Sequence, residues 1–202
     1  MPDYLLQQGR RGYWPHLDLT ERIHSAYAER HGLQYISHRG AVLPEFVGYW
    51  DSVPLMLDLV TREDTGFVAW LDADTLICDD ADPREALGDY LVGMARHAGP
   101  PEHYNCGVLF VRACPQTRVW LQWVLDEAPG SFPWYQQTVM NRLLADPQWD
   151  GRVLTLPNEW NSTVGQGHSP DCHIRAWHGT GTVPERVAMM RAEIERRGLW
   201  AS

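Results

Sequence analysis

The sequence predicts an α/β fold in which one mixed, mostly parallel central sheet lies in a single domain over residues 1–202. Through the first two thirds of the chain, short apolar segments alternate with segments of helical periodicity, which is typical of strands joined by crossover connections. The chain has 202 residues, of which 44% are hydrophobic and 21% are charged. That length suffices for one well-buried core and is short for two.

Runs of apolar residues bounded by turn-forming residues predict the strands. The expected strands cover residues 4–6, 33–37, 67–71, 90–95, 105–111, 153–156 and 173–177. The segment 67–71 (FVAWL) is the most apolar of them. Strands that are buried on both faces lose the polar alternation, so we expect this strand at the centre of the sheet.

Apolar residues three and four positions apart predict the helices. The expected helices cover residues 53–62, 83–87, 117–127 and 136–144, with another helix opening near Asp18 and a last one after Thr182. Asp18 with Glu21, and Thr182 with Glu185, have the spacing of a capping box. Gly32 is suited to end the helix that opens near Asp18, because glycine readily adopts the left-handed conformation of a C-terminal cap.

The charged residues exclude several classes of function. The formal net charge is −9, whereas affinity for a phosphate backbone rests on clustered Lys and Arg, so we expect no nucleic-acid partner. All 17 basic residues are Arg. The absence of Lys excludes a Walker A phosphate loop, a Schiff-base mechanism and a lysine general base.

The cysteines and the N-terminal residues indicate the compartment. The four cysteines form no CxxC pair, so we interpret them as reduced thiols rather than as a zinc site or a disulfide framework. The N-terminal segment MPDYLLQQGRRG lacks the apolar stretch of a signal peptide, and no apolar run is long enough to span a bilayer. We therefore expect a soluble cytoplasmic protein with no transmembrane segment.

The expected central strand runs straight into two acidic residues, Asp72 and Asp74, with Ala73 between them. In an open α/β sheet, ligands bind beyond the carboxyl ends of the strands. Two carboxylates on one side of a strand end repel each other and are costly to desolvate, so they persist where a cation or a proton neutralises them. The pair predicts a site for Mg²⁺ or Mn²⁺, which are hard cations that bind oxygen ligands.

Segments along most of the chain resemble the GT-A glycosyltransferases. FVAWLDADTLI (67–77) resembles their DxD segment and is most similar to that of the retaining fungal Golgi galactosyl- and mannosyltransferases and the plant xyloglucan xylosyltransferases. Further matches follow in family order: AYAERHG (26–32), NCGVLFVR (105–112), QQTVMNRLL (136–144), PNEWNS (157–162) and AWHGTG (176–181). The resemblance implies a Rossmann-like GT-A fold and a metal-dependent, retaining transfer of a sugar from a nucleotide-diphosphate donor, a UDP- or GDP-sugar, to an unknown acceptor.

The same resemblance implies a metal site. Asp72, Asp74 and His178 would be the metal ligands, and this mixed set of oxygen and nitrogen atoms suits Mn²⁺ better than Mg²⁺. The metal would offset the charge that builds up on the departing nucleoside diphosphate. Asp72 would also contact the donor, and it counts among the catalytic candidates.

The other site residues follow from their positions in the matching motifs. Gln137 would lie beside the anomeric carbon and stabilise the transition state electrostatically, because an amide is a poor nucleophile. Gln136 is the second catalytic candidate of this pair. The further substrate-binding candidates from the resemblance are Asn105 and Gly107 beside the donor sugar, and Asn161 and Gly179 in the two late motifs. Trp134 lies outside the motifs, and we expect it in an acceptor wall because its loop, after Gly130 and Pro133, leads to the glutamine pair.

Two positions depart from the family pattern and keep a second interpretation open. Gln136 stands where an acidic residue is usual, and Ser52 stands where a Lys is common. The alternative is a non-catalytic nucleotide-sugar-binding protein or a degenerate partner subunit. A haloacid-dehalogenase-type phosphatase also begins with a strand and a DxD pair, but its pattern needs Thr or Val at the position of Leu76 and a Lys elsewhere, so this class is disfavoured.

Overall fold

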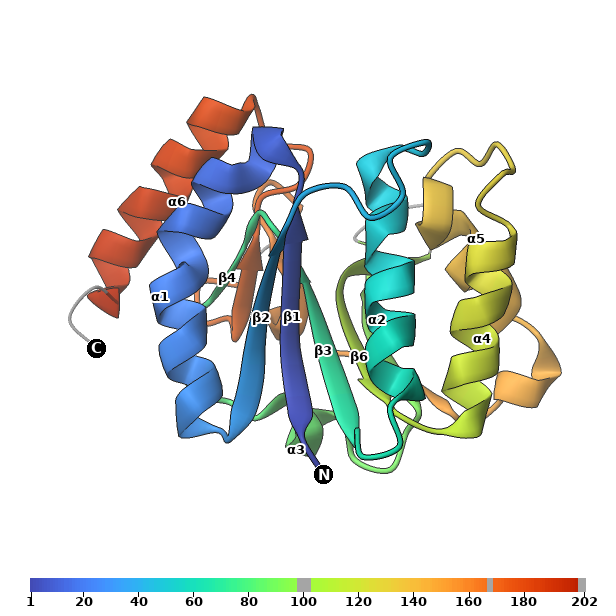
Figure 1. Cartoon of the computed structure of the whole chain (residues 1–202). Helices are drawn as coiled ribbons and strands as arrows, with labels where there is room; N and C mark the ends of the chain where they lie inside the picture. The colour runs from blue at the N-terminus through green and yellow to red at the C-terminus, as the bar shows by residue number, and fades with distance from the viewer. Residues whose placement is uncertain (98–102, 167–168, 200–202) are drawn as a thin grey trace.

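A computed structural model of the protein describes residues 1–97, 103–166 and 169–199. Six strands form one sheet in the order β2-β1-β3-β6-β5-β7 (Figure 1). They are β1 (Asp3–Gly9), β2 (Leu33–Arg39), β3 (Phe67–Asp72), β5 (Val92–Arg96), β6 (Tyr104–Arg112) and β7 (Val153–Leu156). The pairs β1–β2, β1–β3 and β5–β7 are parallel, whereas β6 is antiparallel to both of its neighbours. The predicted mixed α/β sheet is confirmed, with β3 inside it.

Helices cover both faces of this sheet (Figure 1). They are α1 (Trp14–Arg30), α2 (Ser52–Thr61), α3 (Pro83–Leu87), α4 (Pro115–Asp126), α5 (Tyr135–Leu144) and α6 (Val183–Arg197). Short 3₁₀ helices precede α1 (Arg11–Tyr13) and α2 (Gly48–Asp51), and two more flank β7 (Pro147–Trp149 and Asn158–Asn161). Within the residues that the structure describes, none of the helices is long and apolar enough to cross a membrane.

Successive strand residues point to opposite faces of the sheet and so build two separate cores. Leu6 and Val68 are buried in a core with residues of α2, α4 and α5. Their neighbours Leu5 and Ala69 are buried in a second core with residues of α1. The near-continuous apolar composition of β3 (FVAWLD) follows from this burial on both faces.

A small second sheet continues from the end of β3. It contains β4 (Thr75–Ile77), β9 (Ile174–Ala176) and β8 (Ser162–Thr163), in the order β4-β9-β8. β9 runs antiparallel to β4, and the backbone N–H of Trp177 donates to the carbonyl oxygen of Asp74 at 3.1 Å. This pairing places the segment after β9 beside the acidic turn, although the two are far apart in the sequence.

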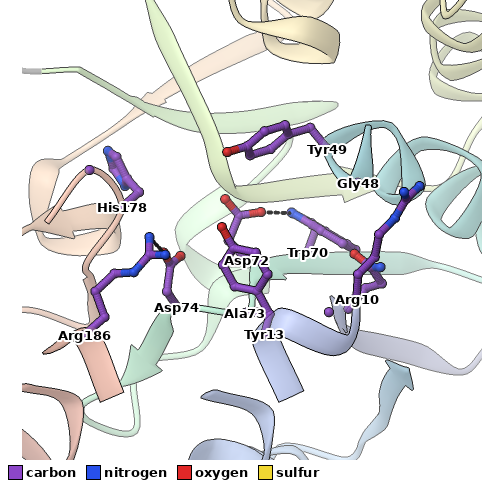
Figure 2. Close-up of a pocket in the computed structure, with 13 residues that line it drawn as sticks. Arg10, Tyr13, Gly48, Tyr49, Trp70, Asp72, Ala73, Asp74, His178 and Arg186 are labelled. Atoms are coloured by element: carbon purple, nitrogen blue, oxygen red, sulfur yellow. Dashed lines mark hydrogen bonds and ion pairs between the residues drawn. The ribbon is translucent and has the colours of Figure 1, made fainter. Parts of the chain in front are cut away.

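Helix α6 packs against α1 and the small sheet. Met190 and Ile194 of α6 share a third core with Leu19 and Ile23 of α1 and with Leu76 of β4. The last helix, predicted to follow Thr182, therefore buries Met190 and Ile194. Because this core anchors α6 along the acidic turn, the first turn of α6 lies next to Asp74 (Figure 2).

The expected start of α1 at Asp18 is wrong. The helix begins at Trp14, with Pro15 in its first turn. Asp18 and Glu21 lie inside the helix, where their carboxylates accept from the two terminal nitrogens of Arg39 at 2.6 and 2.7 Å. Their spacing of three residues places them on one helix face. This spacing is also that of a capping box, but here both residues form ion pairs with Arg39 of β2.

The other two helix-end signals are confirmed. The backbone N–H of Thr182 donates to the Glu185 carboxylate at 2.6 Å and completes a capping box at the start of α6. Gly32 follows α1 with a φ of 65°, a left-handed conformation that costs glycine little.

Gln7 of β1 connects several elements around the end of β3. Its side-chain N–H donates to the carbonyl oxygen of Asp72 at 3.1 Å, and its oxygen accepts from the Tyr35 hydroxyl at 2.9 Å. The same oxygen lies 3.1 Å from Nδ1 of His24, whose Nε2 accepts from the backbone N–H of Ile77. Burial lowers the pKa of His24 to about 3, so the ring is neutral and Nδ1 carries its proton.

We expect Gln7→Met to lower the free energy of unfolding by about 2–4 kcal/mol, because the apolar side chain leaves several buried polar partners unsatisfied. Urea denaturation followed by circular dichroism measures this change. Gln122→Met is the matched control, since Gln122 is exposed on α4 and bonds only to Asp126 among the described residues. Equal stability losses in the two variants would contradict the role of Gln7.

Candidate functional site

A cavity of about 240 Å³ lies beyond the carboxyl ends of β1 and β3 (Figure 2). Ligands of open α/β sheets bind at this edge. The cavity is lined by Gln8, Gly9, Arg10, Tyr13, Gly48, Tyr49, Trp70, Asp72, Ala73, Asp74, His178, Gly179 and Arg186. Of the predicted site residues, it therefore contains Asp72, Asp74, His178 and Gly179.

Asp72 is a carboxylate with few compensating partners. The indole N–H of Trp70 donates to its Oδ1 at 3.1 Å. Its Oδ2 lies so close to Gly107 that a Cβ atom there would approach within 2.9 Å. Burial, and secondarily the charge of Asp74, raise the pKa of Asp72 to about 7. The absence of a side chain at Gly107 thus leaves room for the carboxylate of Asp72.

Asp74 forms an ion pair with Arg186 of α6. The distance from Arg186 Nη1 to Asp74 Oδ2 is 2.9 Å, and the two side chains are only 12% and 7% exposed (Figure 2). Burial raises the pKa of Asp74, while Arg186 and His16 oppose the rise. The acidic pair predicts a neighbouring cation. At Asp74, this cation is the guanidinium of Arg186.

His178 follows β9 and joins the site through Asn105 of β6. Its Nε2 lies 3.1 Å from the side-chain nitrogen of Asn105, whose oxygen accepts from the backbone N–H of Gly107 at 2.8 Å. Burial, with His97 and Arg186, lowers the pKa of His178 to about 4. The ring is therefore neutral, and Nε2 accepts from Asn105, which is the protonation state of a histidine that binds a metal.

The donor set fits a divalent cation in its chemistry. Asp72, Asp74 and His178 line one cavity, and Asp72 carries a raised pKa of the kind that a bound cation would relieve. Within the described part of the chain, no three His, Cys, Asp or Glu side chains already lie at the spacing of metal ligands. Binding of a cation to all three residues would require their side chains to come closer together, and at present Asp74 Oδ2 pairs with Arg186 while Nε2 of His178 accepts from Asn105.

The two glutamines predicted to be catalytic are not among the residues that line the cavity. The side-chain oxygen of Gln137 accepts from the backbone N–H of Cys106 at 3.0 Å, so this residue supports β6. Gln136 is 5% exposed, and its side-chain nitrogen lies 3.6 Å from the sulfur of Cys106. Their catalytic roles remain predictions.

The other predicted substrate-binding residues lie in different environments. Trp134 is exposed at the N-terminal end of α5 and stacks on His103. Asn161 is 6% exposed, and both polar atoms of its side chain lack a hydrogen-bond partner within the described residues. Gly179 lines the cavity with a φ of 72°.

Arg10 also lines the cavity, but its guanidinium is already engaged. It donates to the two carboxylate oxygens of Asp51 at 2.7 and 3.0 Å and to the carbonyl oxygen of Leu43 at 2.7 Å. Asp51 is fully buried and also accepts from the backbone N–H groups of Val42 and Leu43. Arg10 therefore holds the loop after β2 against the 3₁₀ helix that carries Tyr49.

Sequence reasoning did not find Arg186, Tyr13 and Tyr49 as parts of the site. A signal for Arg186 exists, because a positive charge in the first turns of a helix opposes the helix dipole and indicates an anionic partner elsewhere. Tyr13 and Tyr49 lie in short 3₁₀ helices with no such signal. Figure 2 shows their rings extending over the cavity near Asp72.

We expect Asp72→Asn to raise the free energy of unfolding at pH 8 by about 1–3 kcal/mol, because it removes a carboxylate whose raised pKa costs stability. The native-state pKa of about 7 exceeds the ordinary value of 3.8, so the wild type loses stability as the pH rises between these values. The gain should therefore vanish near pH 4. Thermal unfolding at both pH values measures it, and Asp89→Asn, at an exposed carboxylate, is the control. A gain that is equal at both pH values would contradict the raised pKa.

Among known proteins, this chain matches solved structures. No protein-family model matches, and no curated protein does. A glycosyltransferase involved in the glycosylation of the major capsid of PBCV-1 has a TM-score of 0.77 at 17% identity, covering 95% of this chain and 100% of that one. The glycosyltransferase GlyE of Streptococcus pneumoniae TIGR4 has a TM-score of 0.63 at 14% identity. Its match covers 98% of this chain and 64% of GlyE, so this chain spans less than two thirds of that protein.

The galactosyltransferase LgtC, solved with donor and acceptor sugar analogues, has a TM-score of 0.57 at 12% identity and covers 96% of this chain and 99% of that one. At these identities the likeness establishes the fold alone. The narrower resemblance to the fungal and plant enzymes remains a prediction. The chain has the α/β fold of these glycosyltransferases, which is consistent with the predicted GT-A class.

Proposed function

We propose that the protein is a glycosyltransferase that moves a sugar from a nucleotide-diphosphate donor to an acceptor hydroxyl. The observation that supports this most is the acidic pair Asp72 and Asp74, which shares a cavity with neutral His178 and with Arg186 at the ligand-binding edge of a glycosyltransferase fold. The UDP- or GDP-sugar donor and the retention of configuration are proposed from the sequence resemblance.

The reaction sets a clear electrostatic requirement. The bond between the anomeric carbon and the diphosphate oxygen breaks, and its electron pair leaves with the nucleoside diphosphate. The acceptor oxygen forms the new bond to the anomeric carbon, and its proton passes to a base or to water. Negative charge therefore builds up on the diphosphate and must be stabilised by cations. With no Lys in the chain, these cations are an Arg or a bound metal.

Asp72, Asp74 and His178 would hold the metal, Mn²⁺ in preference to Mg²⁺ because of the imidazole. The metal, when bound, supplies a Lewis acid for the departing diphosphate. Arg186 would turn from Asp74 toward the diphosphate. This role is favoured by its Nε, a buried donor that has no hydrogen-bond partner within the described residues. A buried donor without a partner is costly, and the diphosphate would supply the missing acceptor.

A second candidate is a non-catalytic nucleotide-sugar-binding protein. It is favoured by Gln136 and Gln137, which do not line the cavity. Both candidates bind the donor, but only an enzyme transfers its sugar to an acceptor or slowly to water.

A panel of UDP-, GDP- and dTDP-sugars, each with Mn²⁺ and again with chelator, tests the proposal by thermal shift and by donor hydrolysis. We expect one donor to stabilise the wild type only with metal and to be slowly hydrolysed. Asp74→Asn and His178→Ala should lose at least about 90% of the metal-dependent shift, because each removes a ligand. Asp89→Asn should keep it.

The possible results separate the two candidates. A metal-dependent shift without turnover in the presence of acceptors would favour the binding protein. The absence of a shift with every donor would contradict both candidates.

Arg186→Gln tests whether Arg186 and the metal compete for Asp74. We expect the variant to bind Mn²⁺ about threefold to tenfold more tightly than the wild type without donor, because the competing guanidinium is gone. Isothermal titration at pH 7.5 measures the affinity, and Arg191→Gln on the exposed face of α6 is the control. An unchanged or lower affinity would show that Arg186 does not compete with the metal for Asp74.

A further inference from the structure

Three large aromatic side chains remain exposed beside the cavity. The exposed fractions are 54% for Tyr49, 46% for Trp134 and 37% for Tyr135. Exposed apolar residues that are scattered singly need no explanation, whereas a connected group marks a binding surface. These three are connected, because Trp134 and Tyr135 are consecutive and Tyr135 stacks on Tyr49.

The stack of Tyr135 leads directly to the cavity. The ring centroids of Tyr135 and Tyr49 are 4.9 Å apart, with an angle of 14° between the planes. Tyr49 lines the cavity, and Figure 2 shows its ring extending over it near Asp72. One end of this aromatic pair is thus inside the proposed donor site, and the other lies outside it.

A second series of rings leads from Trp134 to the opposite wall. Trp134 stacks on His103 with centroids 4.4 Å apart and an angle of 9°. The ring centroids of His103 and His97 are 4.5 Å apart, and those of His97 and His178 are 5.2 Å apart. His178 lines the cavity. The two neighbouring residues at the start of α5 therefore connect to both sides of the site.

The backbone at Tyr135 has a strained conformation. Tyr135 has a φ of 48°, and it is the only non-glycine residue with positive φ in the part of the chain that the structure describes. Such strain concentrates at ligand sites, where the surrounding structure holds it. Here the backbone N–H of Trp134 donates to the Thr138 hydroxyl at 3.1 Å, and Phe132 packs on buried Trp50 at 6.4 Å.

We propose that Tyr49, Trp134 and Tyr135 form an acceptor subsite, here named the aromatic shelf, and that its ligand is a sugar ring. The inference rests on the proposed glycosyl transfer and assigns the acceptor to the carbohydrates. The acceptor sugar lies on the shelf, and one of its hydroxyls enters the cavity toward the anomeric carbon of the donor.

The chemistry of the shelf matches a sugar better than a purely apolar acceptor. A pyranose has C–H groups on its faces and hydroxyls around its rim. The shelf has the complementary pattern, with aromatic faces and with polar atoms at the ring edges, namely the hydroxyls of Tyr49 and Tyr135 and the indole N–H of Trp134. A lipid chain would leave these polar edges without partners, which costs binding free energy.

Saturation-transfer difference NMR tests the shelf without requiring turnover. The probes are the methyl glycosides of glucose, galactose and mannose, then lactose, and octanol as the apolar alternative. We expect the wild type to transfer saturation to the C–H protons of at least one sugar. The signal should fall at least fivefold in Trp134→Leu and in Tyr135→Leu. Trp123→Leu and Tyr90→Leu are the matched controls, since these residues are 43% and 39% exposed and do not line the cavity.

A second readout links the shelf to transfer. With the best sugar from the NMR experiment, the ratio of transfer to donor hydrolysis should fall at least tenfold in Trp134→Leu relative to Trp123→Leu. Any of three results would overturn the proposal of the aromatic shelf. They are no saturation transfer to any sugar, equal signals in the shelf and control variants, and saturation transfer to octanol but not to the sugars. Failure of the proposed function has a different signature, namely no metal-dependent binding of any nucleotide-sugar by the wild type.

Discussion

The arrangement of the site depends on one electrostatic constraint, the repulsion between two carboxylates at the end of β3. Asp72 and Asp74 are close enough that the charge of Asp74 contributes to the raised pKa of Asp72. The two residues are compensated differently, since Asp74 has an ion pair with Arg186, whereas within the described residues the carboxylate of Asp72 accepts from the indole of Trp70 alone. This asymmetry leaves Asp72 with a raised pKa and holds Asp74 in an ion pair within the chain.

The surrounding residues make this costly arrangement tolerable. Gln7 and the Thr75 hydroxyl donate to the carbonyl oxygen of Asp72 and so hold the turn between β3 and β4. Gly107 leaves space for the carboxylate, and the neighbouring Asn105 bonds to His178. These groups come from β1, β4, β6 and the segment after β9. The conformation of the acidic turn therefore depends on the packing of both sheets. Local order here is therefore tied to the packing of most of the chain.

Some polar residues near the site support the surrounding structure. Arg10 is engaged by fully buried Asp51, and Gln137 by the backbone of β6. The sequence does not distinguish a side chain that contacts a ligand from a side chain that supports the backbone beside the ligand. Both kinds of side chain occur at the same motif positions. Tyr49 shows the converse, since its exposure beside the cavity follows from tertiary packing that local sequence does not predict.

The sequence by itself determined the alternation of strands and helices, the position of Asp72 and Asp74 at a strand end, and the cap formed by Thr182 and Glu185. These features depend on periodicity and on spacings within a few residues, which local sterics and hydrogen bonds enforce. Only the tertiary structure decided that Arg186 pairs with Asp74 and that His178 bonds to Asn105. Those contacts follow from the pairing of β9 with β4 and from the packing of α6 on α1, and long-range pairings of this kind are set by the burial of the whole core rather than by neighbouring residues.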